Sequence, residues 1–194
     1  MDTMDTVVVG AGVIGLACAY QLSQAGREVM VLEQHSAIGT ETSARSSEVI
    51  HAGLYYPTGS LKARACVAGK SMLYQFCREH GVPHRQVGKL IVASDKTQLA
   101  QLHALKRQGD NNSAGDLRIL SAREAQRLEP ELRCAGAIYS PTTGIIDSHS
   151  LMLALEAALE NNGGELVLAS RVSRVEASTS YCQLVMADGG WLQT

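Results

Sequence analysis

The sequence lacks several features that are typical of particular classes of protein. Its 17 Lys and Arg residues face 19 Asp and Glu, so the net charge of -2 gives no electrostatic basis for binding nucleic acid. No apolar run is long enough to span a bilayer. The first apolar stretch follows Asp2 and Asp5 rather than Lys or Arg, so we expect no signal peptide.

The cysteines and histidines show no metal-binding or disulfide pattern. The five cysteines are scattered and form no CxxC pair, and the six histidines form no HExxH pair. We therefore predict no metal, and we interpret the cysteines as small core residues of a cytoplasmic protein. Cys66 and Cys77 lie three helical turns apart, which predicts that they share a buried face.

The sequence does contain a continuous dinucleotide-binding pattern near its N-terminus. An apolar run at residues 7–9 leads into the motif GAGVIG at residues 10–15. A helical segment then ends at Gly26, and a second apolar run at residues 29–32 ends on Glu33. This order predicts a β-α-β unit of the Rossmann type.

Each glycine of the motif has a physical role in such a unit. Gly10 permits the tight turn, Gly12 lets a pyrophosphate approach the backbone, and Gly15 lets the helix pack closely on the strand. A helix-like segment follows the glycines. Its N–H groups and positive dipole end suit a pyrophosphate.

Glu33 and the segment after it bear on which dinucleotide binds. At the end of the second strand, Glu33 is placed to accept hydrogen bonds from ribose hydroxyls and would repel a 2′-phosphate. The fingerprint alone is compatible with FAD and with NAD. A hydroxyl-rich segment at residues 40–47 replaces the further βαβ unit of an NAD domain, which favours FAD.

The remainder of the chain predicts alternating helices and strands. Ser60 is the predicted N-cap of a helix that continues to His80, with an apolar face of Leu61, Ala65, Ala68, Met72 and Phe76. Ser121 and Glu124 predict a capping box, and Ser148 is the predicted cap of a helix over 151–160. Further strands are expected at 89–93, 117–120, 135–140, 145–146, 165–168, 171–177 and 181–186, and a helix at 96–108.

Residues 10–33 together with 43–57 resemble the FAD-dependent oxidoreductases of the D-amino-acid oxidase type. Within that family, EVIHAGLYYP at 48–57 and GSLKA at 59–63 are similar to the L-2-hydroxyglutarate oxidase/dehydrogenase branch. Members of the family continue past the position of Trp191 to a second flavin-contacting segment, so we expect the C-terminal part to be missing from this chain.

The resemblance implies an α/β fold with a discontinuous Rossmann-like FAD-binding domain and an inserted α+β substrate domain. We place the FAD-binding domain at 1–83 and 149–194 and the substrate domain at 84–148. The residues expected to bind FAD are Gly10, Gly12, Val13, Ile14, Gly15, Glu33, Gln34, Thr42, Ser43, Arg45, Ser46 and Val172. From the residues alone, Ser43 and Ser46 are either phosphate donors or turn residues.

The resemblance also places His51 near the isoalloxazine, as a candidate base or substrate ligand. The alternative is a structural histidine bonded to backbone. Tyr55 is our second candidate catalytic residue, because it or Tyr56 would shape the pocket or contact the substrate carboxylate, although either could simply pack. Candidate anion-binding side chains are Arg45, Lys62 and Arg64, for which an ordinary surface position is the alternative.

The implied reaction is hydride transfer from an L-2-hydroxy acid, such as 2-hydroxyglutarate, to FAD, with oxygen or a quinone as final electron acceptor. An amino-acid or amine oxidase, or a glycerol-3-phosphate dehydrogenase, is the alternative on the same scaffold. A non-catalytic nucleotide-binding fragment and an NAD-binding domain are alternatives of other classes. The resemblance leaves peripheral contact with the inner membrane open.

Overall fold

The computed structural model describes residues 3–194, which divide into two compact units. The first joins the segment that ends at Ser47 to the segment Asp147–Thr194, and the second is the continuous segment Glu48–Ile146. The insertion was predicted to begin at residue 84, whereas the second compact unit begins at Glu48. Which segments serve FAD and which serve substrate stays a prediction.

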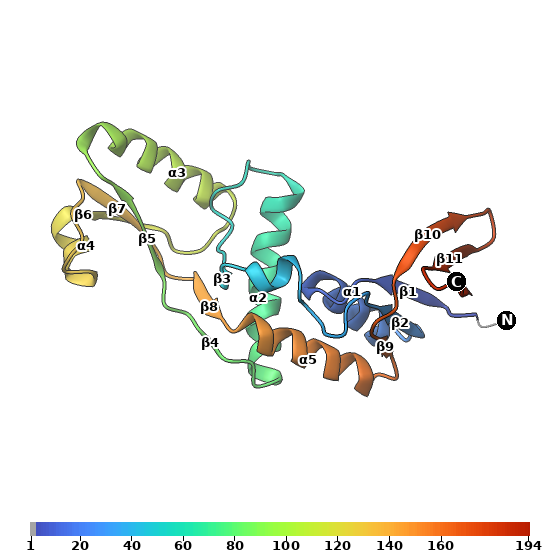
Figure 1. Cartoon of the computed structure of the whole chain (residues 1–194). Coiled ribbons are helices and arrows are strands. Elements are labelled where there is room, and N and C mark those ends of the chain that lie inside the picture. The colour runs from blue at the N-terminus through green and yellow to red at the C-terminus, as the bar shows by residue number, and fades with distance from the viewer. Residues whose placement is uncertain (1–2) are drawn as a thin grey trace. The chain divides into compact units, whose positions relative to one another are not determined.

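The first unit is built on the predicted β-α-β order, which Figure 1 shows in blue. β1 (Thr6–Val9) and β2 (Val29–Leu32) pair in parallel on either side of α1 (Val13–Gln24) in the sequence. β9 (Glu165–Val167) pairs in parallel with the other side of β2, giving the order β1-β2-β9. Valine-rich strands suit this setting, because parallel sheets bury their central strands and β-branched side chains pack well there.

Helix α5 (Ser148–Asn161) packs against α1 in the same unit. Leu16 of α1 and Leu159 of α5 are both completely buried. Just past the end of α5, the Asn162 side-chain amide donates a hydrogen bond of 3.0 Å to the Ser23 hydroxyl of α1. Segments that are far apart in the sequence thus complete one core around the parallel sheet.

The first unit also contains a three-stranded antiparallel sheet. Its strands are β10 (Val172–Ala177), β11 (Cys182–Met186) and β12 (Trp191–Gln193), in that order. The strands predicted at 165–168, 171–177 and 181–186 are confirmed within one residue at each end.

The second unit contains two antiparallel sheets. One has the order β3-β8-β4, from Val49–Ile50, Gly144–Ile146 and His84–Arg85. The other has the order β5-β7-β6, from Lys89–Ala93, Gly136–Ser140 and Arg118–Ser121. The strand predicted at 145–146 therefore pairs with β3 and β4 and not with the neighbouring strand β7.

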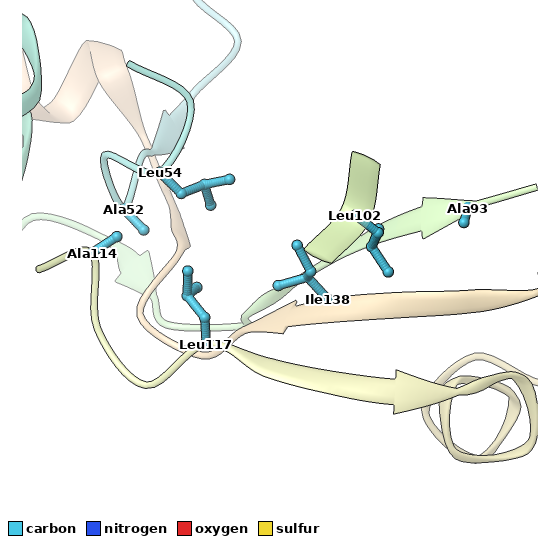
Figure 2. Close-up of a cluster of buried hydrophobic side chains, with 7 residues drawn as sticks. All are labelled: Ala52, Leu54, Ala93, Leu102, Ala114, Leu117 and Ile138. Atoms are coloured by element: carbon cyan, nitrogen blue, oxygen red, sulfur yellow. The ribbon is translucent and has the colours of Figure 1, made fainter. Parts of the chain in front are cut away.

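The core of the second unit gathers around the sheet β5-β7-β6 (Figure 2). Its buried side chains are Ala52, Leu54, Ala93, Leu102, Ala114, Leu117 and Ile138. Leu102 comes from α3 (Leu99–Asn111), which follows a short 3-10 turn, η2 (Lys96–Gln98). The last helix of the unit is α4 (Ala122–Leu128).

Two of the three predicted helix caps are confirmed. Ser60 accepts a hydrogen bond from a backbone N–H of the first turn of its helix, and Ser121 forms the reciprocal capping box with Glu124. The third prediction is wrong by one residue, because Asp147 rather than Ser148 is the N-cap of α5. The carboxylate of Asp147 satisfies an N-terminal N–H and also faces the positive end of the helix dipole.

The prediction of which face of helix α2 (Leu61–Glu79) is buried is wrong. Leu61 is 74% exposed and Met72 is 57% exposed. The buried positions are instead Ala63, Tyr74 and Cys77. Apolar residues occur on both sides of this helix, so their spacing did not reveal which side faces the core. Within residues 3–194, no helix is long and apolar enough to cross a membrane.

Candidate functional site

The glycine turn after β1 has the geometry that the fingerprint predicts. Gly10 has a φ of +102°, a conformation that side chains other than that of glycine rarely adopt. Its N–H donates to the carbonyl of Leu32 at 2.7 Å, which connects the turn to β2. A Cβ on Gly15 would lie 1.9 Å from the Gly10 carbonyl oxygen. Glycine at this position therefore allows α1 to begin directly against the turn.

Ser43 closes the N-terminus of α1 from a distant part of the sequence. It lies in the short 3-10 helix η1 (Thr42–Arg45), and its hydroxyl accepts a hydrogen bond of 3.0 Å from the N–H of Val13. A Cβ on Gly12 would lie 3.0 Å from the same hydroxyl oxygen. Ser43 thus caps this helix from within a 3-10 turn, and its role as a phosphate donor stays a prediction.

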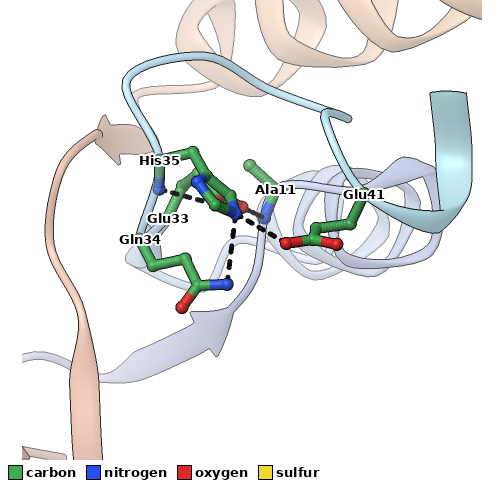
Figure 3. A network of polar contacts seen from close by, with 5 residues as sticks. All are labelled: Ala11, Glu33, Gln34, His35 and Glu41. Carbon is green, nitrogen blue, oxygen red and sulfur yellow. Dashed lines mark hydrogen bonds and ion pairs between the residues drawn. The ribbon is translucent and has the colours of Figure 1, made fainter.

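Glu33 is a buried carboxylate at the end of β2, with 7% of its surface exposed (Figure 3). One carboxylate oxygen accepts a hydrogen bond of 2.8 Å from the N–H of Ala11, and the other accepts one of 2.9 Å from the N–H of His35. The side chain therefore links the glycine turn to the loop after β2. Each carboxylate oxygen keeps a second lone pair, so hydroxyl donors remain acceptable partners.

The loop after β2 carries a second polar group beside Glu33. The Nε2 atom of His35 lies 2.8 Å from a carboxylate oxygen of Glu41 and 3.3 Å from the amide nitrogen of Gln34 (Figure 3). Glu41 is well exposed, and His35 is partly buried. These contacts hold together the two ends of the loop, whose residues Gly39 to Glu41 face the same cleft as Glu33.

These elements surround a cleft of about 390 Å³ in the first unit. Seven of the predicted cofactor residues line it, namely Gly10, Gly12, Glu33, Gln34, Thr42, Ser43 and Val172. The cleft is also lined by seven residues that the sequence reasoning did not select: Val9, Leu32, Gly39, Thr40, Glu41, Ser170 and Arg171. All seven are close in sequence to a selected residue, so their positions could have been inferred from its neighbours.

The other predicted cofactor residues do not line this cleft. Val13, Ile14 and Gly15 belong to the first turn of α1, and the Ile14 side chain is 74% exposed. Arg45 and Ser46 are exposed at the end of η1. For all twelve predicted residues, whether or not they line the cleft, a role in binding FAD stays a prediction.

His51 belongs to the second unit, directly after β3. Its Nδ1 atom is shielded from solvent and has no hydrogen-bond partner among residues 3–194. Burial lowers the pKa of the imidazole below its ordinary value of 6.5, and the positive charge of Lys89 lowers it further. The His51 backbone carbonyl accepts a hydrogen bond of 3.5 Å from the Cys66 thiol. Both effects favour the neutral imidazole, which is the form that can accept a proton.

The two tyrosines that follow His51 each carry a lysine ammonium on the ring. Lys89 lies 4.5 Å from the centre of the Tyr55 ring, and Lys62 lies 4.7 Å from the centre of the Tyr56 ring. Tyr55 is exposed and Tyr56 is half-buried. Both contacts are cation–π interactions. Arg64, the other anion-binding candidate of this segment, is exposed.

The first unit thus defines a class of protein. Parallel strands joined through a glycine turn, a helix that begins at that turn, and a buried carboxylate at the end of the second strand make a dinucleotide-binding α/β fold.

The chain belongs to the FAD dependent oxidoreductase family (DAO), which it matches over residues 5–193. It is 45% identical over 190 residues to a mitochondrial L-2-hydroxyglutarate dehydrogenase from Arabidopsis thaliana and 34% identical over 177 residues to one from Homo sapiens. These alignments cover 95% and 90% of the chain. Its fold is similar to that of L-α-glycerophosphate oxidase from Mycoplasma pneumoniae with FAD bound, at a TM-score of 0.90 and 28% identity, over 97% of this chain and 50% of that one.

These comparisons confirm the predicted family, the α/β fold and FAD as the cofactor of the family. The chain spans 39% of the Arabidopsis relative and 38% of the human one. The predicted cytoplasmic location is wrong in the light of the relatives, because both are described as mitochondrial.

Proposed function

We propose that this chain provides the ADP-binding part of an FAD-dependent oxidoreductase that oxidises an L-2-hydroxy acid of the 2-hydroxyglutarate type. The observation that carries the proposal is the 45% identity over 190 residues to an L-2-hydroxyglutarate dehydrogenase. That alignment covers 95% of the chain. The segment with the more specific resemblance, residues 48–63, contains both candidate catalytic residues, His51 and Tyr55.

The cleft of the first unit fits the ADP half of FAD. Gly12 lines the cleft at the N-terminus of α1, where the helix dipole and the N–H groups other than that of Val13 favour a pyrophosphate. Glu33 offers free lone pairs to ribose hydroxyls at the same cleft. Val172, at the start of β10, lines the cleft and would meet the adenine through its backbone.

The proposed chemistry divides between cofactor and protein. When bound, the flavin supplies a two-electron acceptor for hydride. His51 would take the proton of the substrate hydroxyl, because burial and the charge of Lys89 lower the pKa of its imidazole and so favour the neutral form that accepts a proton. Tyr55 would contact the substrate from the same turn, and its exposed ring leaves the phenol accessible.

FAD binding can be tested on the chain itself with a pair of acidic variants. Glu33→Gln keeps the shape of the side chain but loses one acceptor oxygen, so the N–H of Ala11 or His35 is left unpaired and the ribose is held less well. We expect FAD and ADP to bind about tenfold more weakly, as for the loss of a charge-assisted hydrogen bond. Glu41→Gln changes an exposed carboxylate of the same cleft and should have a small effect. Quenching of flavin fluorescence measures the affinity, with ADP as competitor.

Substrate oxidation separates the competing functions. A flavin-loaded enzyme that contains this chain should lose its visible absorbance with L-2-hydroxyglutarate under anaerobic conditions, but not with glycerol 3-phosphate or L-amino acids. Bleaching by either of the latter would favour the corresponding alternative, and the similarity to a glycerophosphate oxidase makes glycerol 3-phosphate the more important control. A chain that binds NADH but no FAD would instead be an NAD-binding domain. A chain that binds FAD and never bleaches would be a non-catalytic fragment.

We propose oxygen or a quinone as the final electron acceptor. Formation of hydrogen peroxide during turnover in air would identify oxygen. A requirement for an added quinone analogue would identify a quinone, and with it a reason for peripheral contact with a membrane.

A further inference from the structure

The ammonium group of Lys89 is held in the second unit without a carboxylate partner. Lys89 is the first residue of β5 and is half-buried. Its Nζ atom lies 4.5 Å from the centre of the Tyr55 ring, and no acidic side chain within residues 3–194 forms an ion pair with it. A half-buried cation has lost part of its hydration, and a single aromatic ring compensates for this only in part.

Further cations lie close to the same place. Burial raises the pKa of the Cys66 thiol, whereas the positive charges of Lys70, Lys89 and Lys62 act to lower it. Among residues 3–194, the charged groups that shift the pKa values of Cys66 and His51 are lysines. The region around Cys66 is therefore electropositive, as expected of a site that receives an anion.

Lys89 is the best placed of the three lysines to bind an external anion. Lys70 already donates hydrogen bonds to the carbonyl of Ala114 at 3.2 Å and to the hydroxyl of Thr142 at 3.1 Å. Lys62 is exposed, so its ammonium is well hydrated. Lys89 combines partial burial with free donor positions beside the Tyr55 ring, and its positive charge helps to lower the pKa of His51.

We propose that Lys89, with Tyr55 and His51 beside it, forms the subsite for a carboxylate of the substrate. This assignment rests on the proposed function, which makes the substrate a dicarboxylate, and it identifies Lys89 as a specificity-determining residue. The ammonium attracts the carboxylate, the hydroxyl of the exposed Tyr55 side chain offers a further donor, and His51 receives the proton of the substrate hydroxyl.

The subsite can be tested on the 194-residue chain by NMR with glutarate as the probe. Glutarate carries both carboxylates but has no hydroxyl to oxidise. With histidines labelled at Cε1, and the His51 signal assigned from its loss in His51→Gln, glutarate should shift that signal in the wild type. Lys89→Gln should weaken the apparent affinity about tenfold, the change expected for one charge-assisted hydrogen bond. Lys89→Arg keeps the charge and should restore binding.

The matched control is Lys96→Gln, which removes an exposed lysine of the same unit and should leave the glutarate affinity unchanged. Equal affinity in the wild type and Lys89→Gln, or no His51 shift in the wild type, would overturn the subsite. Dispersed histidine signals in Lys89→Gln confirm that the variant is folded. Because glutarate binding requires no turnover, failure of L-2-hydroxyglutarate to bleach the flavin would reject the proposed substrate and not the subsite.

Discussion

At the scale of single residues, the absence of a side chain at Gly15 determines how closely helix α1 can approach the glycine turn. A Cβ there would lie 1.9 Å from the Gly10 carbonyl oxygen, a backbone atom that cannot rotate away. We expect Gly15→Ala to lower the free energy of unfolding by about 1–3 kcal/mol, as for other overpacked sites. Gly69→Ala in α2 is the matched control, since a Cβ at that position meets no atom within 4 Å.

The control should change stability in the opposite direction. Replacing glycine by alanine inside a helix stabilises it by roughly 0.5–1 kcal/mol when nothing obstructs the methyl group. Urea denaturation followed by circular dichroism measures both variants. Equal midpoints for Gly15→Ala and the wild type would show that the glycine turn relaxes without cost.

His51 gives a prediction of pH dependence with a definite sign. Burial and then the charge of Lys89 lower its pKa in the folded chain below 6.5. The unfolded chain therefore binds more protons than the folded chain at and just below pH 6.5. The contribution of this residue to stability is present above that pH and declines as the pH falls towards the lowered pKa.

An NMR titration of the His51 signal measures this pKa directly. We expect a midpoint below 6.5 in the wild type and a higher midpoint in Lys89→Gln, because removing the positive charge favours the imidazolium. Lys96→Gln should leave the midpoint where it is. A wild-type midpoint at or above 6.5 would contradict the shielded position of the ring.

At the scale of elements, helix α2 is held to its unit by polar as well as apolar contacts. Lys70 reaches from the buried face to the Ala114 carbonyl and the Thr142 hydroxyl, and the Tyr74 hydroxyl donates to the Thr142 carbonyl at 3.2 Å. Lys70→Met keeps most of the aliphatic length but leaves the Ala114 carbonyl and the Thr142 hydroxyl without their ammonium partner. We expect a loss of about 1–3 kcal/mol in the free energy of unfolding.

The control for this helix lies on its exposed face. Met72→Gln should change stability by less than about 0.5 kcal/mol, because Met72 is 57% exposed. Thermal or urea denaturation of the two variants gives the comparison. If Met72→Gln lost more stability than Lys70→Met, the buried face of α2 would be the one that the apolar spacing predicted.

The difference between α1 and α2 explains how much of the molecule the sequence could predict. The unit around α1 follows from local requirements, because the turn needs glycine and the end of β2 needs a carboxylate such as Glu33. The orientation of α2 depends on Lys70 and Tyr74, whose polar ends bond to residues about 44 to 72 positions away. The same holds for Ser43, which caps α1 across 30 positions. Contacts of this kind leave no periodic pattern in the sequence.

At the scale of the whole molecule, the chain consists of a continuous unit inserted into a discontinuous one. The ends of the inserted unit are adjacent, since the N–H of Ile146 donates to the carbonyl of Glu48 at 3.0 Å and Val49 pairs with Ile145. Close termini and a separate core are the properties of a segment that can fold alone. The sequence instead predicted an insertion at 84–148, which omits β3, α2 and the turn that carries His51.

The two boundaries predict opposite results for excised fragments. A fragment of residues 48–146 retains all seven side chains of the core in Figure 2, so we expect cooperative unfolding and dispersed amide signals. A fragment of residues 84–148 loses Ala52 and Leu54 from that core and the strand β3 from its sheet. Because Leu54 is completely buried, its loss alone leaves a cavity of the kind that costs about 2–5 kcal/mol, a large part of the stability of a small domain. The shorter fragment should therefore remain largely unfolded. Cooperative folding of 84–148 in the same buffer would show that α2 and the His51 turn belong to the FAD-binding domain, as the sequence predicted.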